Sequence, residues 1–312
     1  MTDITAIGEI LIDLTRSGVS RRGIPQYDAN PGGAPANLAV AAARLGAETA
    51  FIGKVGADRF GDLLRETLEK NGVDCAGLLT DPALATTLAV VSLAAGGERS
   101  FSFYRDPSAD VNLRPEELPT ERLEQTKVLH FGSVSLTGEP IRSATLQAVE
   151  KAKAAGAVIS YDPNYRASLW AEEGTAVEWM KAPLNRVDIL KVSDEELPLL
   201  AGMEDLEEGT AFLAEKGIRL ILVTLGPDGA FYRFGQSTGR IPGVPCKVAD
   251  TNGAGDTFLG AFLAQFVKVG WDGLTVPVLE KMVALSNRAA SITTSRSGAI
   301  PAMPDYGEVF GS

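Results

Sequence analysis

Asp250-Thr251-Asn252-Gly253-Ala254-Gly255-Asp256 is a run of almost bare main chain that ends in a carboxylate. Gly253 and Gly255 can adopt positive φ angles, so successive N–H groups can turn inward and bind an anion. The apolar residues 257–264 predict a helix, whose N-terminus adds unpaired N–H groups and partial positive charge. Asp256 would then lie beside a bound phosphate and accept the proton of an attacking hydroxyl, as phosphoryl transfer requires. The alternative interpretation is a glycine turn that caps a helix, with Asp256 as an ordinary first-turn acid.

The composition excludes several classes of function. The 312 residues are 45% hydrophobic and carry a formal net charge of −11, with no cluster of Lys and Arg to bind a nucleic-acid backbone. A nucleotide substrate stays open, because Mg²⁺ and a few N–H groups can neutralise one triphosphate. No run reaches the roughly 18 apolar residues of a membrane span, and no signal-peptide pattern is present. We therefore expect a cytoplasmic protein with no nucleic-acid or membrane partner.

Cysteine and histidine are too few to build a metal site. Cys75 and Cys246 form no ligand cluster, and they fit a compartment that keeps thiols reduced. The single histidine, His130, lies in the apolar run 128–131, which we expect to be a buried strand.

Strand-like and helix-like runs alternate along the chain and predict a mainly parallel sheet with helices on both faces. The expected strands are residues 4–14, 49–55, 128–131, 158–161, 189–192 and 220–225. The expected helices are residues 35–45, 59–71, 141–155, 195–201 and 210–216. We expect one domain that spans residues 1–312.

One region breaks this alternation. Residues 88–93 and 100–104 are β-rich and are joined across Gly96-Gly97, which predicts a hairpin. With the polar stretch 18–31 they could form a small sheet, a lid made of about residues 15–31 and 86–106. So small a sheet cannot bury both faces, so it must cover a substrate, a second subunit or both. We expect a homodimer that forms through the lid.

Polar residues gather where the strands are expected to end, which is where open parallel sheets bind ligands. Asp13 ends the first expected strand, residues 162–166 and 193–196 follow two others, and Thr224 and Gly226 follow a fourth. In Gly32-Gly33-Ala34-Pro35-Ala36-Asn37, the glycines admit a ligand and Asn37 offers both a donor and an acceptor. This pairing suits a neutral polyol; the alternative is a loop with an asparagine at a helix start. An ordinary Asp ionises near pH 4, so we expect Asp256 to be a ready base throughout neutral pH.

Residues 32–37 and 250–256 together resemble the two motifs of the ribokinase-like (pfkB) carbohydrate kinases, over nearly the full length of the chain. Within that family, residues 8–13, 101–105 and 162–166 are most similar to bacterial fructokinases. The resemblance implies a three-layer αβα core with a β lid, and an ATP- and Mg²⁺-dependent kinase that converts fructose to fructose 6-phosphate. The alternatives are a 2-keto-3-deoxygluconate kinase, a nucleoside kinase and a non-enzymatic sugar-binding regulator.

The resemblance also implies roles for individual residues. Asp256 would be the base, and the N–H groups of Gly253, Ala254 and Gly255 would hold the transferring phosphate. The implied sugar-binding residues are Asp13, Gly33, Asn37, Phe101, Arg105, Arg166 and Asp256. The implied nucleotide-binding residues are Lys191, Ser193, Thr224, Gly226, Gly253, Gly255 and Asn287. Glu196 would hold Mg²⁺ through water, and a K⁺ loop found in some relatives, built mostly from backbone carbonyls, is matched by Asp250, Asn252, Arg296 and Gly298.

Overall fold

A nine-stranded sheet forms the centre of the molecule in the computed structural model, which describes residues 1–93, 99–105 and 107–311. Its strand order is β13-β12-β11-β10-β9-β8-β1-β4-β5. The strands are β1 (Thr2–Ile7), β4 (Thr49–Gly56), β5 (Val73–Asp81), β8 (Thr126–Gly132), β9 (Val158–Asp162), β10 (Ile189–Ser193), β11 (Leu220–Thr224), β12 (Ala230–Phe234) and β13 (Ser237–Ile241). From β5 to β11 neighbouring strands run parallel, and the β12–β13 hairpin adds an antiparallel edge.

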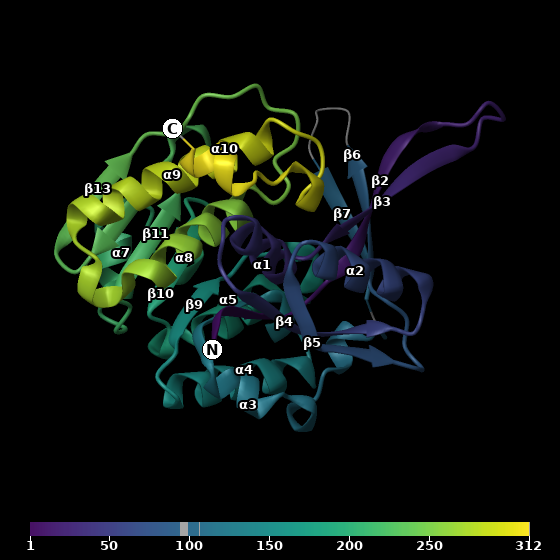
Figure 1. The fold of residues 1–312 in the computed structure, drawn as a ribbon, viewed down its shortest axis with the longest axis horizontal. Helices are drawn as coiled ribbons and strands as arrows, with labels where there is room; N and C mark the ends of the chain where they lie inside the picture. The colour runs from purple at the N-terminus through teal and green to yellow at the C-terminus, as the bar shows by residue number, and fades with distance from the viewer. Residues whose placement is uncertain (94–98, 106, 312) are drawn as a thin grey trace.

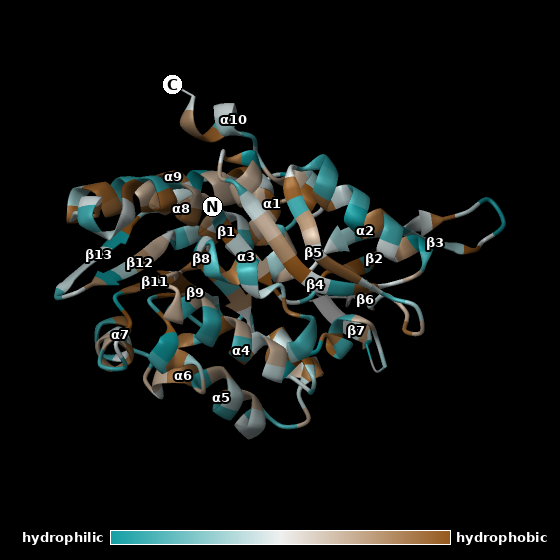
Figure 2. Cartoon of the chain, turned by 60° about the horizontal axis from the view of Figure 1, so that its bottom comes forward, coloured by the Kyte–Doolittle hydropathy of each residue, from teal (hydrophilic) through white to brown (hydrophobic). Residues whose placement is uncertain are grey.

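Helices cover both faces of this sheet (Figure 2). One face carries α1 (Ala34–Arg44), α2 (Arg59–Lys70), α8 (Ala254–Gly273), α9 (Val276–Thr294) and the short α10 (Tyr306–Phe310). The other carries α3 (Thr120–Glu124), α4 (Ile141–Ala154), α5 (Glu173–Lys181), α6 (Leu197–Ala201) and α7 (Leu206–Ala214). Separate hydrophobic clusters fill the two interfaces, with Phe258 and Phe262 in one and the stacked pair Phe131 and Tyr161 in the other. The predicted three-layer αβα fold is confirmed.

A second sheet of four strands, in the order β3-β2-β6-β7, stands off the core (Figure 1). It comprises β2 (Leu11–Val19), β3 (Pro25–Gly32), β6 (Leu88–Leu93) and β7 (Arg99–Tyr104). The predicted pairing of residues 88–93 with 100–104 is confirmed, since Ala89 lies opposite Phe103 in an antiparallel ladder. The turn expected at Gly96-Gly97 lies outside the described residues. We call this four-stranded sheet the lid.

The strand expected at residues 4–14 is in fact two strands in two different sheets. β1 ends at Ile7 in the core sheet, and β2 begins at Leu11 in the lid. Gly8 makes the break at φ 149°, where a side chain is disfavoured and a Cβ would lie 2.8 Å from the Pro35 ring. Asp13 therefore lies within a lid strand, opposite Asn30 and Ala89, and not at the end of a core strand. Sequence alone does not show the break because the residues on both sides of it are apolar and buried.

The other expected helices and strands are present, most of them within a few residues of their predicted bounds. The largest difference is the helix expected at residues 257–264, which is α8 and runs from Ala254 to Gly273. Helix α7 begins earlier than expected, at Leu206, because Asp205 caps it by accepting the Glu208 N–H. His130 is buried in β8, as expected, and its Nδ1 contacts the Ser160 hydroxyl at 3.1 Å. Among the residues described, no helix is long and apolar enough to cross a membrane.

Candidate active site

The glycine-rich turn at residues 250–256 opens onto the N-terminus of α8, as predicted. Gly253 precedes the helix with φ 73°, and its carbonyl accepts the Thr257 N–H at 2.8 Å. Only glycine adopts this left-handed conformation without strain, and here a Cβ would also lie 3.0 Å from the Ala299 Cβ. Because the first N–H groups of a helix lack intrahelical partners, this turn can bind an anion.

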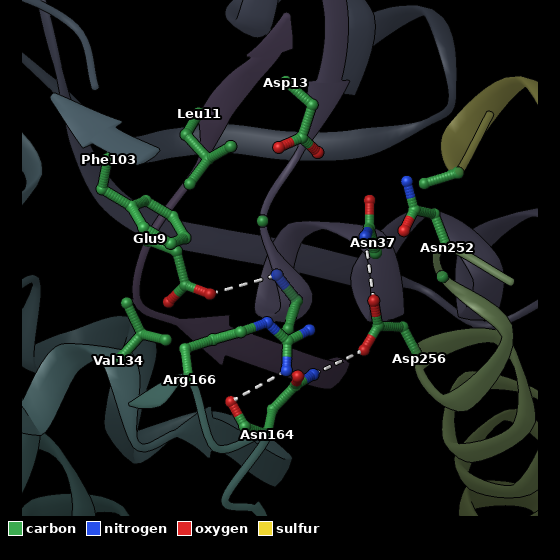
Figure 3. A pocket seen from close by; sticks show the side chains of 14 residues that line it. Glu9, Leu11, Asp13, Asn37, Phe103, Val134, Asn164, Arg166, Asn252 and Asp256 are labelled. Atoms are coloured by element: carbon green, nitrogen blue, oxygen red, sulfur yellow. Dashed lines mark hydrogen bonds between the residues drawn. The ribbon is translucent and has the colours of Figure 1, made fainter. Parts of the chain in front are cut away.

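Asp256 lies in the first turn of α8 with its carboxylate held on both sides (Figure 3). Asn37 Nδ2, from α1, donates to Oδ2 at 2.8 Å, and Asn164 Nδ2 donates to Oδ1 at 3.0 Å. Burial raises the pKa of Asp256 to about 6, against the opposing effect of the Asn37 hydrogen bond. The expectation of an ordinary pKa near 4 is therefore wrong, because the sequence does not show how deeply this carboxylate is buried.

Asn164 is a site residue that sequence reasoning missed. It is the one described non-glycine residue with a positive φ, at 47°, and its N–H donates to Asp162 Oδ1 at 3.1 Å. Asn tolerates the left-handed conformation because its side chain can bond locally. The turn aims the Asn164 amide at Asp256. The sequence places residues 162–166 at a strand end, but it predicts a role only for Arg166 among them.

A pocket opens between Asp256 and the lid (Figure 3). Its described lining is Glu9, Leu11, Asp13, Gly33, Ala34, Asn37, Phe103, Val134, Asn164, Arg166, Asn252, Gly253, Asp256 and Ala299. Carboxyl groups dominate its charged lining, with Arg166 as the cation. Burial raises the pKa of Asp13 to about 6, opposed by Arg166, and raises the pKa of Glu9 to about 7. We call this cavity the lid-side pocket.

Four of the residues expected to bind sugar line this pocket besides Asp256: Asp13, Gly33, Asn37 and Arg166. Phe101 lies in β7, with its side chain outside the described part, and Phe103 in the same strand lines the pocket. Sequence reasoning missed Phe103.

Arg105 does not line the lid-side pocket, contrary to expectation. It is buried at the base of the lid, where its Nε donates to Asp110 Oδ2 at 2.7 Å. One terminal nitrogen donates to the Thr137 hydroxyl at 2.6 Å and the other to the Val134 carbonyl at 3.2 Å. Arg105 thus ties the end of β7 to the core. The sequence could not show this because Thr137 and Val134 are distant in the chain.

A second cavity, of about 350 Å³, lies on the other side of the α8 N-terminus and we call it the cleft pocket. Thr224, Gly226, Gly255 and Asn287 line it, as expected for a nucleotide site. The irregular segment 243–248 contributes the apolar wall and was missed because it has no periodic pattern. Its size and apolar wall suit a flat aromatic base.

Lys191 and Ser193 line neither pocket, but Lys191 lies against the anion-binding turn. A Cβ on Gly255 would come within 3.0 Å of Lys191 Nζ, which also pairs with Asp162 Oδ2 at 2.9 Å. Burial alone would lower its pKa, but Asp162 and Glu196 raise the pKa of Lys191 above its usual value. A buried positive charge therefore lies beside the turn.

Glu196 is held in place by main-chain donors. Its Oε1 accepts the Tyr165 N–H at 2.7 Å and its Oε2 the Ser193 N–H at 2.9 Å, while Ser193 Oγ accepts the Glu196 N–H. The described residues contain no group of three or more acidic, His or Cys side chains able to hold a metal directly. The lone pairs of the Glu196 carboxylate that accept no main-chain N–H could bind the water ligands of a metal ion.

Asp250 joins the two loops expected to hold K⁺. Its Oδ1 accepts the Asn252 N–H at 2.8 Å and its Oδ2 the Gly298 N–H at 3.1 Å. Arg296 directs its guanidinium to Glu308 instead. The structure thus brings Asp250, Asn252 and Gly298 together, while the Arg296 side chain pairs with Glu308.

Comparisons with known proteins agree with this arrangement. The model of the pfkB family of carbohydrate kinases matches residues 1–306. The chain is 43% identical to fructokinase-2 of Solanum lycopersicum (98% of this chain, 94% of that protein) and 42% identical to fructokinase-1 of Zea mays (98% and 96%). Among solved structures it is similar to a fructokinase with bound ATP from Xylella fastidiosa (TM-score 0.91, 32% identity, 98% and 96% covered). It is equally similar to a Vibrio cholerae fructokinase in a fructose-, ADP- and potassium-bound form (TM-score 0.91, 35% identity, 99% and 97% covered).

Proposed function

The chain belongs to the pfkB family of carbohydrate kinases, and we propose that it transfers the γ-phosphoryl group of ATP to D-fructose, giving fructose 6-phosphate and ADP. The observation that carries this proposal is the meeting of two pockets at one helix N-terminus. Asp256 and Gly253 line the lid-side pocket, and Ala254 and Gly255 line the cleft pocket. A hydroxyl bound on one side and a phosphate on the other would therefore meet at this turn.

The chemistry follows from these positions. Asp256 accepts the proton of the primary hydroxyl as the hydroxyl oxygen bonds to phosphorus and the bond from phosphorus to the ADP oxygen breaks. The N–H groups of residues 253–256 and the Lys191 ammonium offset the negative charge of the transferring group. Asn37 and Asn164 keep the carboxylate oriented during the transfer. Mg²⁺, carried by the ATP phosphates and reached by Glu196 through water, would supply further positive charge.

The lining of the lid-side pocket favours a neutral sugar over a sugar acid. Glu9, Asp13 and Asp256 face the pocket, and Arg166 is its cation. Arg105, the second arginine expected to reach the substrate, pairs with Asp110 and the core instead. The carboxylate of 2-keto-3-deoxygluconate would be repelled by these acidic groups. Fructose is neutral, so its binding carries no such electrostatic cost.

The direct test is a panel of initial rates with ATP and fructose, 2-keto-3-deoxygluconate, ribose, adenosine or fructose 6-phosphate. We expect the highest kcat/KM for fructose, with a fructose KM that does not change between low and high ionic strength, because a neutral ligand is not screened. A higher kcat/KM for the sugar acid, with a KM that rises steeply with salt, would overturn the choice of acceptor.

The pH profile should report the raised pKa of the base. Burial raises the pKa of Asp256 to about 6 and that of Asp13 to about 6, so both are ionised at pH 7 and become protonated as the pH falls. Glu9, which lines the same pocket, has its pKa raised by burial to about 7. Since a protonated Asp256 cannot accept a proton, kcat/KM should be level above about pH 8 and fall at least tenfold per unit well below pH 6, with apparent pKa values that belong to the coupled carboxyl groups. A profile that stays level down to pH 5 would contradict the assignment.

We also propose that K⁺ binds the loops joined by Asp250, through backbone carbonyls near Asn252 and Gly298. The potassium-bound form of the Vibrio cholerae fructokinase supports the proposal by similarity. The cation would stabilise the glycine-rich turn at residues 250–256.

We also propose a cytoplasmic location, because the free thiols of Cys75 and Cys246 support a compartment that keeps thiols reduced.

We propose that two copies pair through their lids. The lid exposes large apolar side chains, among them Tyr104 at 67% and Tyr27 at 48% of their surface. Packing two lids together would cover them in a symmetric contact. Sedimentation velocity at micromolar concentration should show a dimer for the wild type and a shift toward monomer for Tyr104→Asp. A wild type that is only monomeric would refute the proposal.

A further inference from the structure

Glu9 lies where the chain passes from the core sheet into the lid, between the end of β1 and the start of β2. It is only 4% exposed and lines the lid-side pocket beside Phe103 and Val134 (Figure 3). Its Oε1 accepts the Ala34 N–H at 3.1 Å. One carboxyl oxygen therefore has a structural partner, at the point where β3 leads into α1.

The second carboxyl oxygen of Glu9 has no such partner. Its Oε2 is buried and makes no hydrogen bond to any described residue. Arg105 is the nearby cation, but its hydrogen bonds go to Asp110, Thr137 and Val134, and none of them reaches Glu9 Oε2. A buried carboxyl oxygen without a donor is unfavourable, so a donor from a bound molecule would stabilise it.

Asn37 presents the same situation on the Asp256 side of the pocket. Its Nδ2 donates to Asp256, and its buried Oδ1 makes no hydrogen bond within the described part of the chain. Figure 3 shows Glu9 and Asp256 on opposite sides of the cavity, with Arg166 reaching between them. The pocket thus offers two unsatisfied acceptors at separate positions. A ligand with several hydroxyl donors satisfies both, and a carboxylate satisfies neither.

We propose that Glu9 is a substrate-binding residue, whose Oε2 accepts a hydrogen bond from a sugar hydroxyl at the end of the pocket remote from Asp256. This inference rests on the proposed sugar kinase function and adds to it a second point of attachment. Glu9 then holds the sugar through a hydroxyl that does not react. The contact is the same before and during phosphoryl transfer, so it strengthens sugar binding without changing the chemical step.

The test combines Glu9→Gln with four fructose analogues that each lack one non-reacting hydroxyl: 1-deoxy-, 3-deoxy- and 4-deoxy-D-fructose, and 2,5-anhydro-D-mannitol, which lacks the anomeric hydroxyl. Glu9→Gln keeps the size of the side chain and can still accept the Ala34 N–H. At pH 8, above the raised pKa of Glu9, we expect the fructose KM to rise roughly 10- to 100-fold, the range for one hydrogen bond to a charged group, with kcat within about threefold. For the one analogue that lacks the bound hydroxyl, wild type and Glu9→Gln should have equal KM values within about threefold, because the contact is already absent.

Glu117→Gln is the matched control. Glu117 also accepts a main-chain N–H, that of Arg114, and pairs with Lys54, but it lies outside the lid-side pocket. It should leave the fructose KM unchanged. If Glu9→Gln raises the KM of fructose and of all four analogues by the same factor, Glu9 acts only on the fold and the inference is wrong.

An unchanged fructose KM in Glu9→Gln would also refute the inference. If Glu9→Gln does not fold, Glu9→Asp replaces it; this variant keeps the charge but is too short to reach both Ala34 and the sugar, and the same comparison of analogues decides. The wild-type rate with fructose tests the proposed function separately, so the failure of one can be told from the failure of the other.

Discussion

Asp256→Asn is expected to lower kcat by at least about 10²-fold while the fructose KM stays within a few fold of the wild-type value. The substitution keeps the size of the side chain, so Asn37 and Asn164 can still pack against it. What it removes is the proton acceptor beside the anion-binding turn. Steady-state kinetics with saturating ATP give both constants, and a single-turnover measurement confirms that the chemical step is the one that slows.

Asp13→Asn is the comparison for this variant. Asp13 is an acidic residue of the same pocket, but it lies in the lid strand β2 and not at the start of α8. Its replacement should raise the fructose KM more than it lowers kcat, because it removes a sugar contact and leaves the base in place. If Asp256→Asn turned over at an ordinary rate, Asp256 would not be the base and the proposed mechanism would have to be abandoned.

The second large effect is expected for Gly253→Ala, which should lower kcat by about 10²-fold, the loss typical of one donor in an anion-binding site. Gly253 has φ 73°, and an alanine Cβ there would lie 3.0 Å from the Ala299 Cβ. The turn must therefore shift, and its N–H groups would no longer point at the transferring phosphate. Measured kcat and Tm together separate this loss from simple destabilisation.

Gly270→Ala provides a matched control within the same helix. Gly270 also has a positive φ, 63°, but no atom lies within 4 Å of the position its Cβ would take. It should lose stability of about 1–3 kcal/mol, because φ 63° with ψ −179° is a backbone conformation that glycine alone adopts readily, with little change in kcat. Equal kcat values in the two alanine variants would mean that the geometry at Gly253 does not matter for catalysis.

The main elements of the fold could be predicted from the sequence, because βαβ alternation is a local pattern that repeats along the chain. The split between β1 and β2 could not, since Gly8 interrupts an apolar run whose two halves are both buried. Strands β12 and β13 and helix α9 had no prediction. β13 lies at the sheet edge and none of its residues is buried, so it carries little hydrophobic signal.

The residues of the candidate site likewise divide into those that the sequence predicts and those that it does not. Residues 250–256 and Asn37 could be chosen in advance because their chemistry follows from short motifs. Arg105 could not be placed, because a side chain that leaves the lid strand can turn either to the pocket or to Asp110, and only the packed structure decides. Asn164 was missed for a related reason: its function depends on a left-handed backbone angle, which the residue type permits but does not require.

The position of the anion-binding turn has a consequence for how such an enzyme can change its substrate specificity. Gly253 and Asp256 are separated by less than one turn of helix, so the spacing between phosphate and proton acceptor is inherited with a single short segment. The sugar meets side chains supplied by β2, β7 and the loop after β9, which are encoded far from that segment. Substitutions in the lid can therefore change which polyol the protein accepts, while the residues that transfer the phosphoryl group stay the same. For the protein engineer, the lid is the part to exchange and the α8 turn is the part to transplant whole.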